Sequence, residues 1–168
     1  MKMSAALAED LRCSATRLSE TAFHFPESNS LIRSPVTSGA GVGDVVLDAP
    51  DLATAQRERR RILSRSTDEV PAVMLKIEAV LADTFGEARI KSAEPACSQG
   101  TTPRTIRYVG TAVGLAGLIA DIAAADVADG VVIVSLPMSE PPTAVVQETL
   151  PWLEQRNLIE SVSSVSVS

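Results

Sequence analysis

The sequence predicts an α/β fold in which about four strand–helix units form either an open parallel sheet or part of a TIM-like barrel. Short β-branched segments alternate with stretches of helical spacing from residue 43 to residue 159. The composition is 45% hydrophobic but only 3% aromatic, which suits helices packed on a buried parallel sheet. A complete eight-stranded barrel needs about 200 residues or more, so a chain of 168 residues predicts only a partial, half-barrel arrangement.

Four segments are predicted to be strands that lie parallel and adjacent, with helices on one side of the sheet: Val45–Leu47, residues 72–81, Ile106–Val109 and residues 131–135. The second segment has an alternative interpretation. Its β-branched residues and the alternation of Lys76 and Glu78 favour a strand, whereas a continuous helix beginning at Pro71 is the other structure that this composition allows.

Helix boundaries follow from capping residues. Asp51 is expected to cap a helix that ends near Ser64, and Thr84 to cap a helix over Phe85–Lys91. Thr111 is expected to cap a helix of roughly 15 residues. A final helix is expected over Ala144–Gln155, with Pro142 near its first turn.

These elements divide the chain into three regions. Residues 1–42 are expected to form an N-terminal helix over 3–19 and a Gly/Ser/Pro-rich loop, and residues 43–159 to form the strand–helix units. Residues 92–104 are a second expected loop within the second region. Residues 160–168 are expected to be a flexible tail, with an added edge strand as the alternative.

Charge and composition exclude several classes of partner. A net charge of −6 and few aromatic residues argue against nucleic acid, and we expect the basic run Arg57–Arg61 to be a solvated helix face. No apolar run approaches the ~20 residues that span a bilayer, so no membrane association is expected. Cys13 and Cys97 are far apart and fit free thiols in a cytoplasmic protein. The spacing of histidine and cysteine predicts no metal site.

Short segments in a particular order carry a family resemblance. Those near the C-terminus are Val109-Gly110-Thr111-Ala112, Ala128-Asp129-Gly130-Val131 and residues 148–157. Upstream are residues 43–50, followed by Ala55-Gln56, and residues 81–89. In this order the segments resemble the C-terminal half of the bacterial luciferase-like flavin-dependent monooxygenases. The resemblance covers residues 43–91 and 105–159.

The resemblance implies a flavin oxidoreductase reduced to part of its barrel. Members of that family are complete barrels of roughly twice this length, and nothing before residue 43 matches their N-terminal half. Ala112 also stands where the family has proline. We therefore expect a truncated or degenerate member that binds FMN, or a related flavin or deazaflavin, weakly and has little activity alone.

The alternative hypothesis is a non-catalytic half-barrel interaction module. A four-stranded arc would leave two sheet edges and an apolar face uncovered, so we expect pairing with a second copy or with a larger homologue. The N-terminal helix could instead cover the same face within one chain.

Two glycine-containing segments are candidate cofactor-binding sites. Ser38, Gly39 and Gly41 lie in a Gly/Ser run that could cradle a phosphate, with a flexible linker as the alternative. Gly110 and Thr111 lie at a strand-to-helix junction that offers N–H groups to an anion, with a simple Thr N-cap as the alternative. No catalytic residue is assigned.

Three further residues are candidate catalytic groups. His24 has no carboxylate partner that the sequence can place, so a packed loop histidine is favoured. Asp48 and Asp51 follow a strand, and turn or capping roles account for both.

Overall fold

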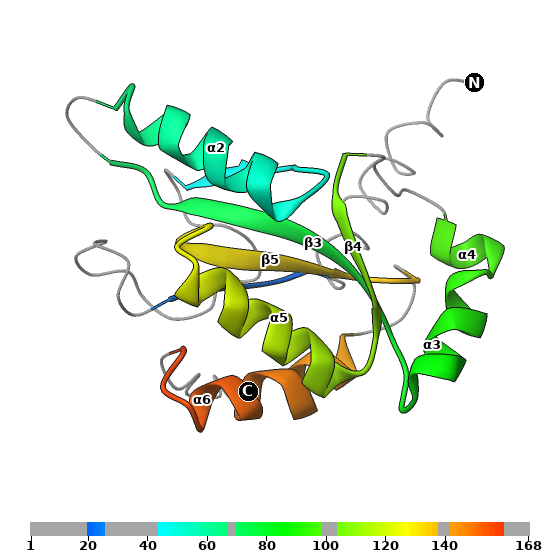
Figure 1. The fold of residues 1–168 in the computed structure, drawn as a ribbon. Coiled ribbons are helices and arrows are strands. Elements are labelled where there is room, and N and C mark those ends of the chain that lie inside the picture. Colours follow the sequence, from blue (N-terminus) through cyan, green and yellow to red (C-terminus); the bar gives the residue numbers. More distant parts are fainter. Residues whose placement is uncertain (1–19, 26–43, 67–69, 99–103, 138–141, 160–168) are drawn as a thin grey trace, which may run out of the picture.

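A computed structural model describes residues 20–25, 44–66, 70–98, 104–137 and 142–159 (Figure 1). The expected N-terminal helix over 3–19, nearly all of the Gly/Ser/Pro-rich loop, and the tail over 160–168 lie outside these ranges. Cys13, Ser38, Gly39 and Gly41 lie outside them as well.

The described strands form one open, mostly parallel sheet. They are β1 (Glu20–His24), β2 (Val45–Leu47), β3 (Val73–Leu81), β4 (Ile106–Gly110) and β5 (Gly130–Ser135). Strand β3 is central. It pairs in parallel with β5 on one edge, and on the other edge with β2 through residues 73–75 and with β4 through residues 77–81. The four expected strands are therefore parallel, as the sequence predicts, and the other three each pair directly with β3.

Strand β3 settles the ambiguity over residues 72–81. Val73, Leu75, Ile77 and Val80 are completely buried, and the strand pairs along both edges. β-Branched side chains suit such a doubly covered strand, which buries both of its faces. The helical alternative from Pro71 is wrong.

Strand β1 was not expected from the sequence. It pairs antiparallel with β5, with His24 opposite Gly130, and so lies at the edge of the sheet. Residues 1–42 therefore contribute a strand to the same sheet as residues 43–159, although the sequence predicts only a helix and a loop for them. Phe23 and Phe25 place their rings in the core, which fixes this added strand.

The helices are α2 (Leu52–Leu63), α3 (Phe85–Ser92), α4 (Pro95–Ser98), α5 (Ala112–Ala124) and α6 (Leu150–Glu154), with a π-helical turn η1 (Val145–Thr149) before α6. The expected caps are present. Asp51 accepts a hydrogen bond from Thr54 N at 2.7 Å, and Thr84 and Glu87 form a capping box. The bonds from Thr54 lower the pKa of Asp51.

Two helical features differ from expectation. The short helix α4 lies within the expected loop over 92–104, where Cys97 is buried. The last helix is not uniformly α-helical, because η1 precedes α6 and Pro151 stands at the start of α6. Proline has no N–H to donate, so a regular α-helical ladder cannot run through this position.

Helices lie on both faces of the sheet rather than on one. The main core joins inward side chains of β3 and β5 to α2, α5, η1 and α6, through residues that include Leu75, Ile77, Ile133, Ala55, Leu115, Ile119, Val145 and Leu153. Cys97 of α4 instead packs with Val80, Val134 and Leu136. Because successive strand residues point to opposite faces, this second cluster lies across the sheet from the first.

The basic run on α2 is not entirely a solvated face. The Arg59 side chain is only 13% exposed and forms ion pairs with Asp126 at 2.9 Å and Asp129 at 2.8 Å. Its hydrogen bond to Asp129 is the main reason that the pKa of Arg59 is raised. Asp129 also accepts a hydrogen bond from Val73 N at 2.9 Å, so one carboxylate ties α2 to the start of β3.

The two glycines of α5 lie in different surroundings. A Cβ at Gly114 would collide with the Tyr108 hydroxyl, whereas a Cβ at Gly117 would meet nothing within 4 Å. Gly117→Ala is expected to raise the free energy of unfolding by about 1 kcal/mol, because alanine favours helix. Gly114→Ala is expected to give no such gain, because Tyr108 must shift and strain its hydrogen bond to Thr111 O.

Urea unfolding of both variants tests this difference, and Tyr108→Phe provides the matched background. In the Tyr108→Phe background, which lacks the hydroxyl, Gly114→Ala should raise the free energy of unfolding nearly as much as Gly117→Ala does. Equal gains from Gly114→Ala and Gly117→Ala in the wild-type background would show that Tyr108 does not cover the start of α5.

Candidate functional site

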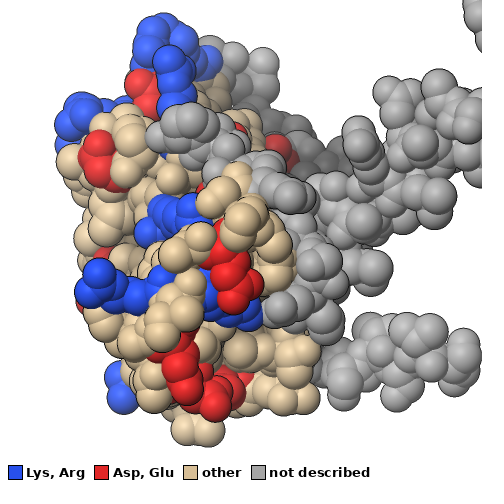
Figure 2. Space-filling model, turned by 90° about the vertical axis from the view of Figure 1, so that its right-hand side faces the viewer, with Lys and Arg blue, Asp and Glu red and all other residues tan. Residues whose placement is uncertain are grey.

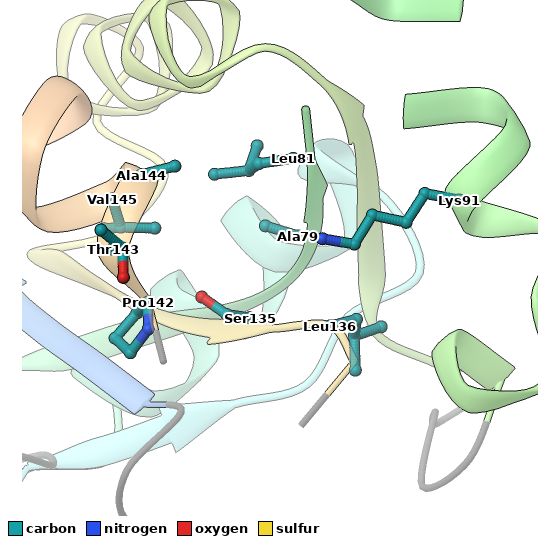
Figure 3. Close-up of a pocket in the computed structure, with 9 residues that line it drawn as sticks. All are labelled: Ala79, Leu81, Lys91, Ser135, Leu136, Pro142, Thr143, Ala144 and Val145. Atoms are coloured by element: carbon teal, nitrogen blue, oxygen red, sulfur yellow. The ribbon is translucent and has the colours of Figure 1, made fainter. Parts of the chain in front are cut away.

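A pocket of about 250 Å³ opens at the carboxyl ends of β3 and β5 (Figure 3). Its walls come from four parts of the fold: Ala79 and Leu81 of β3, Ser135 and Leu136 at the end of β5, Lys91 of α3, and residues 142–145. Ligands of open α/β sheets bind outside the carboxyl ends of the strands. This pocket therefore occupies the position where a ligand is most expected.

The pairing of β3 with β5 sets two of these walls. Ala79 lies opposite Ser135 in the parallel register, and Leu136 N donates to Ala79 O at 2.8 Å. The two side chains that face one another in register point to the same side of the sheet. The chain then leaves the sheet through a cis peptide bond between Leu136 and Pro137.

Helix starts close by in the sequence position Lys91 and residues 142–145, the fourth wall of the pocket. The capping box of Thr84 and Glu87 starts α3 soon after β3 ends, and Lys91 lies in the last turn of that helix. Helical conformation begins again at Thr143 and continues through η1 and α6. The Thr149 hydroxyl donates to Ala112 O at 3.1 Å, which fastens this helical run to the start of α5.

Ser135 carries an unusual hydroxyl group. The residue is 8% exposed, and its Oγ has no hydrogen-bond partner among the residues that the structure describes. A buried hydroxyl without a partner costs about 1–3 kcal/mol. In Figure 3 the Ser135 oxygen points into the space between β3 and the helical run. A ligand in the pocket would supply the missing partner.

The one charged group in the described lining of the pocket is positive. Lys91 is the one ionisable residue among the nine described residues that line the pocket, and Figure 3 shows its ammonium group extending from α3 toward Ala79. The first N–H groups of a helical run have no acceptor within the helix, so those after Pro142 face outward as donors. On the surface of the side that carries α3 and α4, basic and acidic groups lie next to one another (Figure 2).

The predicted site at Gly110 and Thr111 lies beside this pocket but does not line it. Gly110 pairs with Leu81, a pocket wall, and the Thr111 hydroxyl accepts from Gly114 N at 3.2 Å. The Tyr108 hydroxyl donates to Thr111 O at 3.2 Å, and a Cβ at Gly110 would come within 2.6 Å of that hydroxyl. Burial raises the pKa of Tyr108. Thr111 is thus a helix cap, and flavin binding at this junction stays a prediction.

The remaining candidates have structural partners. Asp48 accepts a hydrogen bond from the Thr105 hydroxyl at 2.8 Å, which joins the end of β2 to the start of β4, and Asp51 caps α2. His24 belongs to β1 rather than to a loop. Ser38, Gly39 and Gly41 lie outside the described residues, so the phosphate-cradle hypothesis for them is unchanged.

Sequence reasoning missed Ser135 and Lys91. A polar residue directly after the apolar run Val131–Val134 was a signal for Ser135, because it marks the carboxyl end of a buried strand. Nothing in the sequence marked Lys91, which reaches the pocket only because α3 is folded back beside β4.

The fold and pocket define an α/β protein with a small cavity at the carboxyl edge of its sheet, whose described lining includes a lysine. No family model matches the chain, and no curated protein sequence matches it. Within the described ranges, no helix is long and apolar enough to cross a membrane. The same residues include no group of three or more His, Cys, Asp or Glu side chains that could hold a metal ion.

Proposed function

We propose that the chain is a degenerate, partial TIM-like member of the luciferase-like flavin-dependent monooxygenases, and that it binds FMN or a related flavin or deazaflavin weakly. The observation that supports this most directly is the pocket at the carboxyl ends of β3 and β5, the edge where barrel enzymes hold their ligands. The ordered family-like segments supply the chemical class. The segment Ala128–Val131 leads into β5, one of the two strands that carry the pocket.

The size of the pocket is the reason to expect weak binding. Pockets for drug-sized ligands are about 300–1,000 Å³, and this pocket is about 250 Å³. It can hold one end of a flavin nucleotide, with the remainder of the molecule against the surface. Affinity then comes from a few contacts only, and dissociation is rapid.

The chemistry of the lining is the reason to expect little turnover. The nine lining residues that the structure describes include no histidine, cysteine or carboxylate that could exchange a proton with a substrate. A chain that binds flavin without a placed acid or base would carry the cofactor rather than use it alone.

A flavin titration tests this proposal. Quenching of FMN fluorescence by the purified chain should be saturable, with a Kd weaker than about 10 μM because the pocket encloses only part of the ligand. Ala144→Phe should abolish the quenching, because residue 144 lines the pocket. Val146→Phe is the matched control, since Val146 is in the same helical run but is 50% exposed and does not line the pocket.

Three results would contradict the proposal in different ways. Absence of saturable quenching would show that FMN is not a ligand of the chain. Equal quenching by wild type and Ala144→Phe would place the flavin elsewhere on the chain. Robust oxygen-dependent turnover by the isolated chain would show that it is an active enzyme and not a degenerate one.

The second candidate is a non-catalytic module that pairs with a second copy or a larger homologue. It is favoured by the open sheet, in which β1 and β2 each pair with one neighbour among the described strands. Unpaired strand edges are templates for association. Light scattering across a concentration series separates the two candidates, because a dimer that does not quench FMN would support the module alone.

A further inference from the structure

We infer that the pocket contains a phosphoryl-binding subsite, in which the Ser135 hydroxyl, the Lys91 ammonium group and the N–H groups after Pro142 bind the terminal oxygens of a phosphate monoester. The inference deepens the proposed function, on which it rests for the identity of the whole ligand. The subsite itself is argued from the pocket alone, so it can be tested with phosphate alone.

The first support is the buried Ser135 hydroxyl. A serine hydroxyl offers one donor and two acceptor positions, and the described residues fill none of them. Water in the pocket would satisfy it in the free protein. An anionic oxygen would do so with a charge-assisted hydrogen bond, which is shorter and stronger than a neutral one.

The second support is the sign of the charge around that hydroxyl. Lys91 contributes an ammonium group from α3, and none of the other eight described residues that line the pocket is ionisable. The start of the helical run at Thr143 adds backbone donors and a partial positive charge, which stabilise anions. The described lining therefore offers hydrogen-bond donors and an ammonium group, which suit an anion better than a cation.

The third support is the number and origin of the donors. They come from three separate elements, β5, α3 and the helical run, which surround one small volume (Figure 3). A phosphate monoester has three terminal oxygens that can each accept from a different direction, whereas a carboxylate has two oxygens in one plane. Donor groups on different sides of one cavity therefore match a phosphoryl group better than a carboxylate.

Titration with inorganic phosphate at constant ionic strength tests the subsite directly. In two-dimensional amide NMR spectra, phosphate should shift the resonances of Ser135, Lys91 and residues 143–145. Ser135→Ala and Lys91→Gln should each weaken phosphate binding about tenfold, the effect of losing one hydrogen bond to a charged group. Ser64→Ala and Arg89→Gln are matched controls on exposed residues, and they should leave binding unchanged.

Ser135→Ala is also expected to fold. The change removes a buried hydroxyl that has no partner in the described structure, so its melting temperature should be equal to or above that of wild type. Loss of phosphate binding in this variant therefore reports the subsite and not unfolding. Phosphate binding that is indifferent to both Ser135→Ala and Lys91→Gln would overturn the inference.

Two comparisons separate failure of the subsite from failure of the proposed function. Acetate shifting the same amides as strongly as phosphate would overturn the phosphoryl assignment. FMN should bind about tenfold more tightly than riboflavin, which has the same ring and no phosphate. Equal binding of the two flavins, together with no effect of Ser135→Ala, would overturn the subsite and leave flavin binding intact. Specific phosphate binding without any flavin binding would support the subsite and contradict the proposal that the ligand is a flavin.

Discussion

Replacing Asp129 with alanine is expected to lower the free energy of unfolding by about 3 kcal/mol or more. The carboxylate is 10% exposed and binds Arg59 at 2.8 Å, and it also accepts from Val73 N at 2.9 Å. Its removal leaves a buried guanidinium without its main counter-charge and a buried backbone N–H without an acceptor. Urea unfolding followed by the fluorescence of Trp152, the single tryptophan, measures the loss.

Asp126 provides the matched control, because it binds the same arginine from a side chain that is 78% exposed. Asp126→Asn should cost less than about 1 kcal/mol, as exposed ion pairs do. The loss of unfolding free energy in Asp129→Asn should fall between those of Asp126→Asn and Asp129→Ala, since the new amide oxygen can still accept from Val73 N. Equal effects of the changes at 126 and 129 would show that burial does not decide the strength of these pairs.

Replacing Gly130 with alanine is expected to lower the free energy of unfolding by about 2–3 kcal/mol. A Cβ at this position would collide with the backbone carbonyl oxygen of Phe23 and lie 2.8 Å from the sulfur and methyl carbon of Met74. The Met74 side chain can move, but the carbonyl belongs to β1, which is held against β5. The new methyl group therefore pushes the edge strand away.

Urea unfolding and amide hydrogen exchange test this prediction together. In Gly130→Ala, the amide of Phe25, which donates to Asp129 O at 2.9 Å, should lose its protection against exchange. Gly86→Ala is the control, because a Cβ at Gly86 would have its nearest neighbour at 4.0 Å. Unchanged stability and protection in Gly130→Ala would mean that β1 does not lie along β5.

The proposed subsite shows how a simple sheet can become a binding site. Strand β5 is buried over its whole length and ends in Ser135, so its last side chain is fixed where β3 also ends. A rigid strand end positions a hydroxyl more precisely than a loop does. The site then needs only a cation and a helix start from neighbouring elements, which α3 and the run from Thr143 supply.

The sequence by itself determined the local structure of this protein. Asp51, Thr84 and Thr111 cap helices where their side chains and spacing predict, because a cap depends on residues within one turn. The β-branched runs form the four parallel strands, since β-branched side chains favour strands, and the two central strands, β3 and β5, bury both of their faces. The α/β class followed from these signals.

Only the tertiary structure decided which distant elements meet. The antiparallel strand β1, the burial of Arg59, and the meeting of Lys91 with Ser135 have no local signature, because each depends on packing between residues far apart in the chain. Strand order is decided in the same way, with β5 beside β3 and with β2 and β4 sharing one edge. The local sequence pattern decides whether a segment forms a helix or a strand, whereas the burial of whole faces decides which elements pack side by side. The candidate site is formed by such elements, which are far apart in the sequence.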